Sequence, residues 1–142
     1  MNIDSIQNGY VIDHIRAGLS MEIYQYLGLK YLDCSVAIIQ NAKSRRMGKK
    51  DIIKIDAEIP INWDMLGYID PEITVNVIRN AERVEKRNLA LPERVINVIR
   101  CKNPRCITQE EREVEQVFFL ADRQNHTYRC LYCESAHQRE KS

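Results

Sequence analysis

The chain has 142 residues, 44% of them hydrophobic, which is enough to build the core of one ordinary domain or two small ones. Its 21 Lys and Arg residues nearly balance 20 Asp and Glu residues, and a net charge of +1 excludes the broad positive field that non-specific nucleic-acid binding requires. No stretch approaches the roughly 20 apolar residues that cross a bilayer, and no signal-peptide pattern opens the sequence. We therefore expect a globular, cytoplasmic protein that binds neither membranes nor nucleic acid.

The first part of the chain predicts a strand and an amphipathic helix. Residues 10–15, "YVIDHI", have the pattern of a short strand. Residues 19–28 then repeat apolar side chains at helical spacing, and Gly28 is suited to end the helix. The predicted apolar stripe consists of Leu19, Ile23, Tyr26 and Leu27.

A long hairpin and a second helix follow. Residues 32–41 and 50–59 have the pattern of two strands around a polar turn, where Gly48 supplies backbone freedom. Residues 61–70 fit a short helix with Asn62 as its N-cap.

Two further strands complete the predicted sheet. Residues 72–80 alternate as a fourth strand, and residues 82–88 add a fifth at the edge. The order βαββαβ is that of a ferredoxin-like sandwich, an α+β fold in which helices cover one face of an antiparallel sheet. The periodicity ends near Pro92, so we place a boundary between a domain of residues 1–90 and a second domain of residues 91–142.

The uncovered face of this sheet combines charged and apolar side chains. Lys50 and Lys54 share one face of their strand with Ile52. Asn76 lies on the mixed face of the fourth strand, and we expect it to join them from a neighbouring strand. Ammonium groups beside an amide and an aliphatic floor suit the phosphates, ribose and base of a nucleotide. For the basic residues Lys43, Arg45 and Arg46, a solvated hairpin tip is a safer interpretation than an anion-binding rim.

Four of the five cysteines gather near the end of the chain. Cys101 and Cys106 lie in "CKNPRC", and Cys130 and Cys133 lie in "CLYC" after a gap of 23 residues. Two such turns supply the four thiolates of a tetrahedral structural zinc ion, which leaves no open position for catalysis. The strand-like runs between them predict a small all-β zinc-binding domain. A unit of about 50 residues buries too little apolar surface to fold stably without a bound metal ion. Free buried thiols or disulfides are the alternatives, and a reducing compartment disfavours disulfides.

No other pattern indicates catalysis. The chain contains no Gly-rich phosphate loop, no HExxH and no GxSxG. Asp13 and His14 are neighbours in a strand, so we expect their side chains to point to opposite faces and not to act together. Cys34 alternates with apolar residues, which favours a small core residue.

Six short phrases of the sequence resemble a known family. In order, "VIDHI", "MGKKDIIKI", "TVNVI", "LPERVINVIRC", "CKNPRC" and "CLYC" resemble the regulatory chain of aspartate carbamoyltransferase, over about residues 3–133. The resemblance implies a non-catalytic subunit of pyrimidine biosynthesis with an allosteric nucleotide-binding domain and a zinc domain that docks on the catalytic chain. The implied effectors are CTP, ATP and UTP, and the implied hetero-oligomer joins three regulatory homodimers to two catalytic trimers.

The resemblance also implies which residues bind. His14 and Lys86 would meet phosphates, Asp13 and Lys54 the ribose, and the backbone of residues 3–6 the base. Lys50 would serve a second nucleotide. The implied nucleotide-binding set is Ile3, Asp4, Ile6, Val11, Asp13, His14, Lys50, Lys54, Asn76, Ile78 and Lys86, and the implied zinc ligands are Cys101, Cys106, Cys130 and Cys133.

Two positions depart from the family pattern. Ala81 and Arg83 stand where relatives carry an aromatic and an aliphatic residue against the base, and the N-terminal arm is shorter. A site rejects the wrong base when that base leaves a buried donor or acceptor of the protein without a partner. The Ala81 side chain has no such group, and the long Arg83 side chain can turn to a phosphate or to solvent. The expected consequence is weak discrimination between CTP and ATP.

Two other functions compete with a regulatory chain. An RNA-binding sheet usually presents aromatic side chains on its central strands, and "YVIDHI" and "KDIIKI" have none in the middle. A thiol redox enzyme would expose a reactive thiolate in "CLYC", whereas zinc-bound thiols resist alkylation. We rank both below the regulatory chain.

Overall fold

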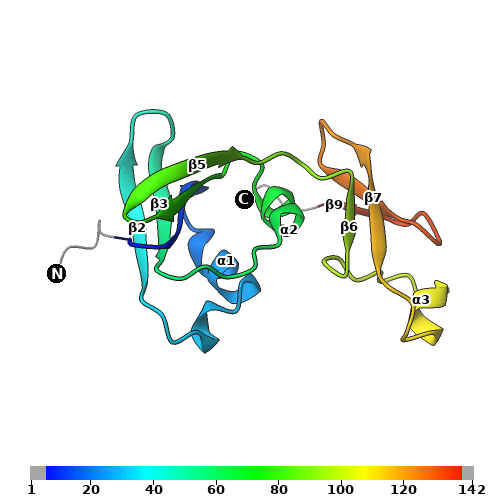
Figure 1. Cartoon of the computed structure of the whole chain (residues 1–142). Helices are drawn as coiled ribbons and strands as arrows, with labels where there is room; N and C mark the ends of the chain where they lie inside the picture. Colours follow the sequence, from blue (N-terminus) through cyan, green and yellow to red (C-terminus); the bar gives the residue numbers. More distant parts are fainter. Residues whose placement is uncertain (1–5, 139–142) are drawn as a thin grey trace. The chain divides into compact units, whose positions relative to one another are not determined.

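The chain divides into two compact units, Met1–Ala90 and Leu91–Ser142. The computed structural model describes residues 6–138, and Figure 1 shows the order of its elements. No helix within those residues has both the length and the apolar character needed to cross a membrane.

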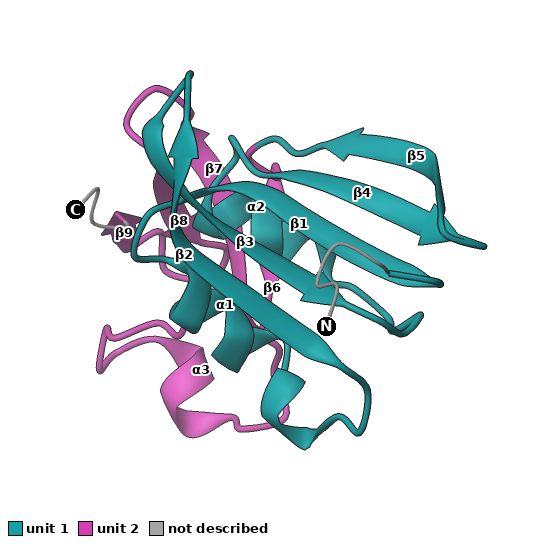
Figure 2. Ribbon diagram, turned by 90° about the vertical axis from the view of Figure 1, so that its left-hand side faces the viewer, with its two compact units in different colours: residues 1–90 teal, residues 91–142 magenta. Residues whose placement is uncertain are grey.

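The first unit is built on an antiparallel sheet with helices on one face (Figure 2). In its described part, the strands lie in the order β2-β3-β1-β4-β5, and the chain reaches β2 and β4 through helices α1 and α2. This is the ferredoxin-like order, so the predicted α+β fold is confirmed, including the fifth strand at the edge. The bounds are β1 Gly9–Arg16, α1 Ser20–Tyr26, η1 Leu29–Tyr31, β2 Val36–Ser44, β3 Gly48–Ile55, α2 Trp63–Ile69, β4 Thr74–Arg79 and β5 Glu82–Asn88.

The core of this unit follows from strand alternation. One face of each central strand is fully buried and carries residues such as Ile12, Ile53 and Val75. Ile23 of α1 and Leu66 of α2 are buried with them, because the helices cover that face. No helix among the described residues covers the other face, which we call the open face (Figure 2).

A buried carboxylate connects three parts of the unit. Asp51 of β3 is fully buried, and its two oxygens accept backbone N–H bonds from Gly18 at 3.0 Å, Ser20 at 3.3 Å and Asn41 at 3.0 Å. Burial raises the pKa of Asp51, but these hydrogen bonds outweigh it and hold the pKa below its ordinary value. The start of α1 and the irregular part of β2 between Ile39 and Ala42 are thereby fixed to β3.

The helices match the prediction except in one side chain. The Asn62 side chain accepts from the Met65 N–H at 3.1 Å, as expected of an N-cap. Gly28, at φ 64°, ends α1 in the left-handed region that glycine adopts easily. The prediction that Tyr26 belongs to the buried stripe is wrong, because α1 ends at this residue and its side chain is 45% exposed.

The predicted hairpin begins later in the structure. The short helix η1 and an irregular stretch occupy residues 29–35, so β2 starts at Val36 and not at residue 32. Cys34 therefore lies outside the strand and is only half-buried, and its prediction as a core residue is wrong.

The second unit is a small sheet with one short helix. In its described part the strand order is β6-β7-β8-β9, all antiparallel, which confirms the predicted all-β domain. Phe118 and Tyr128 fill its core, and the Tyr128 hydroxyl donates to Pro92 O at 2.6 Å. The bounds are β6 Arg94–Ile96, α3 Ile107–Glu110, β7 Val117–Asp122, β8 Thr127–Cys130 and β9 Ala136–Gln138.

Candidate metal centre and ligand-binding face

Four cysteines converge at one end of the second unit. Cys101 and Cys106 come from the loop that leads into α3, where the Cys106 N–H donates to Asn103 O at 3.1 Å. Cys130 ends β8, and Cys133 follows in a tight turn closed by the Glu134 N–H donating to Cys130 O at 2.9 Å. Two local turns thus present two thiols each.

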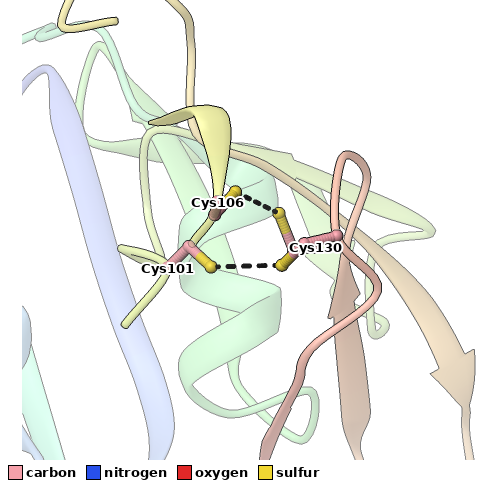
Figure 3. Close-up of side chains that lie close together, drawn as sticks. Cys101, Cys106 and Cys130 are labelled. Atoms are coloured by element: carbon pink, nitrogen blue, oxygen red, sulfur yellow. Dashed lines mark hydrogen bonds between the residues drawn. The ribbon is translucent and has the colours of Figure 1, made fainter. Parts of the chain in front are cut away.

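The sulfur atoms are arranged for a metal ion and not for disulfides. All four lie within 4.8 Å of one another, with Cys101 Sγ 3.6 Å from Cys133 Sγ and Cys106 Sγ 3.7 Å from Cys130 Sγ (Figure 3). A disulfide needs about 2.05 Å, whereas four sulfurs held at about 2.3 Å around one ion lie about 3.8 Å apart. The donor set and its spacing therefore fit a tetrahedral metal site.

Side chains that the sequence analysis missed support this cluster. Thr108 Oγ1 donates to Cys106 Sγ at 3.2 Å, Gln116 Oε1 accepts from the Cys101 N–H at 3.0 Å, and Gln109 Nε2 donates to Cys101 O. Such contacts orient metal ligands. Only the proximity of Thr108 and Gln109 to Cys106 in the sequence could have indicated them.

The environment affects the thiols differently. Burial raises the pKa of the Cys101 thiol to about 12 and also raises that of Cys130. A hydrogen bond with the Ser135 hydroxyl lowers the pKa of Cys133 to about 6. Because metals bind thiolates, an ion entering this cluster must displace protons from the buried thiols.

Four of the residues predicted to bind nucleotide form one row across the open face of the first unit. Val11 of β1 pairs with Lys54 of β3 on one side and with Asn76 of β4 on the other. Asn76 in turn pairs with Lys86 of the edge strand β5. Asn76 is thus separated from Lys54 by β1, whereas the sequence suggested neighbouring strands.

A β-bulge brings Asp13 and His14 together. The pairing of β1 with β3 shifts register between Ile12 and Ile15, and His14 takes φ 57°. His14 Nδ1 then lies 2.8 Å from Oγ1 of Thr74, the residue opposite Asp13. The expectation that Asp13 and His14 point to opposite faces is wrong, because strict alternation fails at a bulge.

Asp13 and Lys50 form an ion pair at the same end of the face. Their Oδ1 and Nζ atoms are 2.9 Å apart, and both side chains are less than one-fifth exposed. Burial raises the pKa of Asp13, but hydrogen bonds from Lys50 and from the His14 N–H outweigh it and lower the pKa overall. Asp13 is therefore a fixed anion that orients Lys50.

The side-chain oxygen of Asn76, Oδ1, is buried without a hydrogen-bond partner among residues 6–138. Buried acceptors without a partner are rare in native proteins. Ile78, the remaining predicted residue of β4, is half-buried on the same face.

The chain entering β1 is held at the edge of this face. Ile6 is buried, whereas Ile3 and Asp4 lie outside the described residues. Asp56, just after β3, accepts from the backbone N–H groups of Gln7 at 3.1 Å and Asn8 at 3.4 Å. No sequence pattern marks Asp56, because its partners are 48 and 49 residues away.

The turn between β4 and β5 holds the same segment from the other side. The Ala81 N–H donates to Gln7 O at 2.9 Å, and the Asn80 N–H donates to Asn8 Oδ1 at 3.2 Å. Asn80 and Ala81 both have positive φ, 52° and 65°, as a two-residue hairpin turn requires. Residues 7 and 8 therefore have fixed positions beside the predicted base-reading arm.

Both units match family models. Residues 1–90 match the aspartate carbamoyltransferase regulatory chain, allosteric domain, and residues 93–142 match the metal binding domain of the same chain.

Relatives named aspartate carbamoyltransferase regulatory chain are similar over nearly the whole length. The protein of Clostridium botulinum strain Hall is 52% identical over 134 residues, covering 94% of this chain and 92% of the relative. That of Clostridium tetani is 49% identical over 139 residues, covering 97% and 96%, and that of Bifidobacterium longum is 43% identical over 134 residues, covering 94% and 96%.

An allosteric domain followed by a metal-binding domain defines a regulatory chain and not a catalytic one. The chain belongs to the aspartate carbamoyltransferase regulatory-chain family, as its sequence phrases predict.

Proposed function

We propose that this chain is the non-catalytic regulatory subunit of an aspartate carbamoyltransferase and binds CTP, ATP and UTP on the open face of its five-stranded sheet. Binding there would pass allosteric control of pyrimidine biosynthesis to a catalytic chain. The observation that carries the nucleotide assignment is the row of Lys54, Asn76 and Lys86 across one face of the sheet, which places two ammonium groups and an amide on the same surface.

The rest of the face supports the same ligand. Lys86 is exposed at the edge, where it can meet phosphates, and the His14 ring lies at the opposite end of β1 from Gly9. Lys54 lies on β3 and Lys86 on β5, and these strands are separated by three inter-strand distances, about 14 Å in all. An extended nucleoside triphosphate can span this distance. Lys50, paired with Asp13, would serve a second nucleotide beside the first.

We propose zinc for the cysteine cluster, with Cys101, Cys106, Cys130 and Cys133 as ligands. Zinc combines soft thiolate ligands with tetrahedral geometry, and four protein ligands close its coordination shell. The ion would supply folding free energy to the small second unit and take no part in chemistry. The free thiols also suit the reducing cytoplasm, where we expect the chain to act.

Two protein partners complete the proposal. The second unit would dock on the catalytic chain, and the first would pair with a second regulatory chain within the hetero-oligomer. Strand β2 supports the homodimer, because it is an edge strand of nine residues whose Val36–Ile39 segment is apolar and half-buried. Such an edge offers unpaired backbone groups to a partner strand.

Calorimetric titration of the chain with CTP and ATP tests the nucleotide site. Lys86→Ala and Lys54→Ala should each remove a charge-assisted hydrogen bond of about 1.5–3 kcal/mol and weaken binding about ten- to hundredfold. Lys43→Ala, an exposed lysine of β2, is the matched control and should bind as the wild type does. Unchanged affinity in both test variants would place the site elsewhere.

A further inference from the structure

A polar pocket lies on the second unit beside the cysteine cluster. Its volume is about 540 Å³, and its polar lining consists of Asn97, Arg100, Thr108, Gln109, Arg112 and Gln116. All of these residues belong to Leu91–Ser142, so the pocket is a feature of this unit alone. Its lining contains two cations and no carboxylate.

The two arginines have no partner in the described part of the chain. Neither the Arg100 nor the Arg112 guanidinium forms an ion pair or hydrogen bond with a residue among 6–138. Two other arginines of this unit are engaged, since Arg123 donates to Leu91 O and Arg129 donates to Glu134 O. The neighbouring segment holds four exposed glutamates that do not line the pocket, namely Glu110, Glu111, Glu113 and Glu115.

The pocket wall is attached to the cysteine cluster. Thr108 contacts Cys106 Sγ, and Gln109 and Gln116 hold the backbone of Cys101 from its two sides. The same three side chains line the pocket. The shape of the pocket therefore depends on the order of the cluster.

We propose that this pocket receives carboxylate side chains from an acidic surface segment of the catalytic chain. The inference rests on the proposed docking of this unit. Guanidinium groups match carboxylates with paired N–H donors, and such pairs are strong when partly desolvated. The chain has a net charge of +1 and exposed glutamates near the pocket, so it has no broad field that attracts anions. Selection of an acidic group would therefore rest on direct contact with the two arginines that line the pocket.

Assembly with the cognate catalytic chain tests this assignment. We would measure the dissociation constant by analytical ultracentrifugation at 50 and 300 mM NaCl for the wild-type chain, R100Q, R112Q and the double variant. The double variant should assemble about ten- to hundredfold more weakly at low salt and respond less to added salt. Both arginines are exposed, so the variants should fold, and unchanged zinc content and CTP affinity would verify this.

R94Q is the matched control. Arg94 is an exposed arginine of the same unit that lines a different pocket, which also contains Glu93. Assembly weakened in the double variant but not in R94Q supports the assignment. Equal weakening in R94Q would indicate a general charge effect and overturn it.

Two further outcomes separate the possible errors. If the wild type assembles and the double variant assembles equally well, the pocket assignment is wrong while docking stands. If the wild type does not assemble at all, the proposed docking fails and this inference fails with it. Stoichiometric binding of inorganic phosphate that is lost in the double variant, with assembly unaffected, would make the pocket a small-anion site instead.

Discussion

Asp51 shows how one residue can hold several elements. Asp51→Asn replaces one acceptor oxygen by an amide donor, so at least one of the backbone N–H groups of Gly18, Ser20 and Asn41 loses its partner. We expect a loss of about 1–3 kcal/mol in the free energy of unfolding of the first unit. Urea denaturation followed by the fluorescence of Trp63, the only tryptophan and a residue of that unit, measures it.

The same carboxylate predicts a pH dependence. Its folded pKa is lowered, so its contribution is fully present above the unfolded value of about 3.9 and is lost as pH falls through the folded pKa. The stability difference between wild type and Asp51→Asn should therefore shrink below about pH 4. Asp33→Asn, at an exposed position, is the control and should show little change at any pH. A constant difference down to pH 2 would contradict the explanation.

Base selectivity is also decided at single residues. Ala81 is exposed in the β4–β5 turn, and Arg83 is exposed opposite Ile78. Neither can penalise a wrong base, so CTP and ATP should bind within about tenfold of each other, roughly 1.4 kcal/mol. Arg83→Ala should weaken both nucleotides to a similar degree in calorimetric titrations. A hundredfold preference for one base, or a loss selective for one, would refute this.

At the scale of elements, local signals predict most of the architecture. The helices and strands, the Asn62 cap and the all-β character of the second unit follow from periodicity and short-range chemistry, and the order βαββαβ then identifies the ferredoxin-like sheet. The two cysteine pairs, which the structure brings within 4.8 Å, are marked by their spacing alone. Each element and each cysteine pair is marked by residues close in sequence, which is why it can be predicted.

Most of what the sequence does not reveal depends on how separate elements meet in the fold. The bulge at Asp13 and His14 forms where β1 must pair with β3 and β4 at once, and no alternation pattern encodes it. The hydrogen bond between the Gln7 N–H and Asp56 joins residues 49 positions apart. The pocket lined by Arg100 and Arg112 combines residues from a loop, from α3 and from the segment that leads into β7. Tyr26 looks like a core residue only if the helix continues beyond it, and the helix ends there.

At the scale of the whole molecule, the two units should respond separately to loss of metal. Cys130→Ser leaves three thiolates, so the variant should lose its zinc and fail to assemble with the catalytic chain. Nucleotide binding by the first unit should survive. Zinc analysis, ultracentrifugation and CTP titration of one preparation measure all three. Full zinc content together with normal assembly would contradict the proposed metal site.

Acid should release the metal from the wild type. The raised pKa values of Cys101 and Cys130 mean that protons compete strongly for these sulfurs, so metal affinity should fall steadily as pH decreases. A chromogenic zinc indicator added at pH values between 8 and 5 would follow the release. The first unit, monitored by Trp63 fluorescence, should remain folded over that range.

The central place of β1 in its sheet also bears on how the protein folds during synthesis. β1 leaves the ribosome first, yet both of its partners, β3 and β4, follow about 40 and 65 residues later along the chain. Until β4 emerges, β1 has an unpaired side, and the β2–β3 hairpin is the first part of the sheet that can form by itself. Closure of this sheet depends on pairings between distant residues, which places its folding in the range of milliseconds to seconds. A nascent chain stalled before residue 74 should therefore remain open to protease, and one released beyond residue 88 should become resistant.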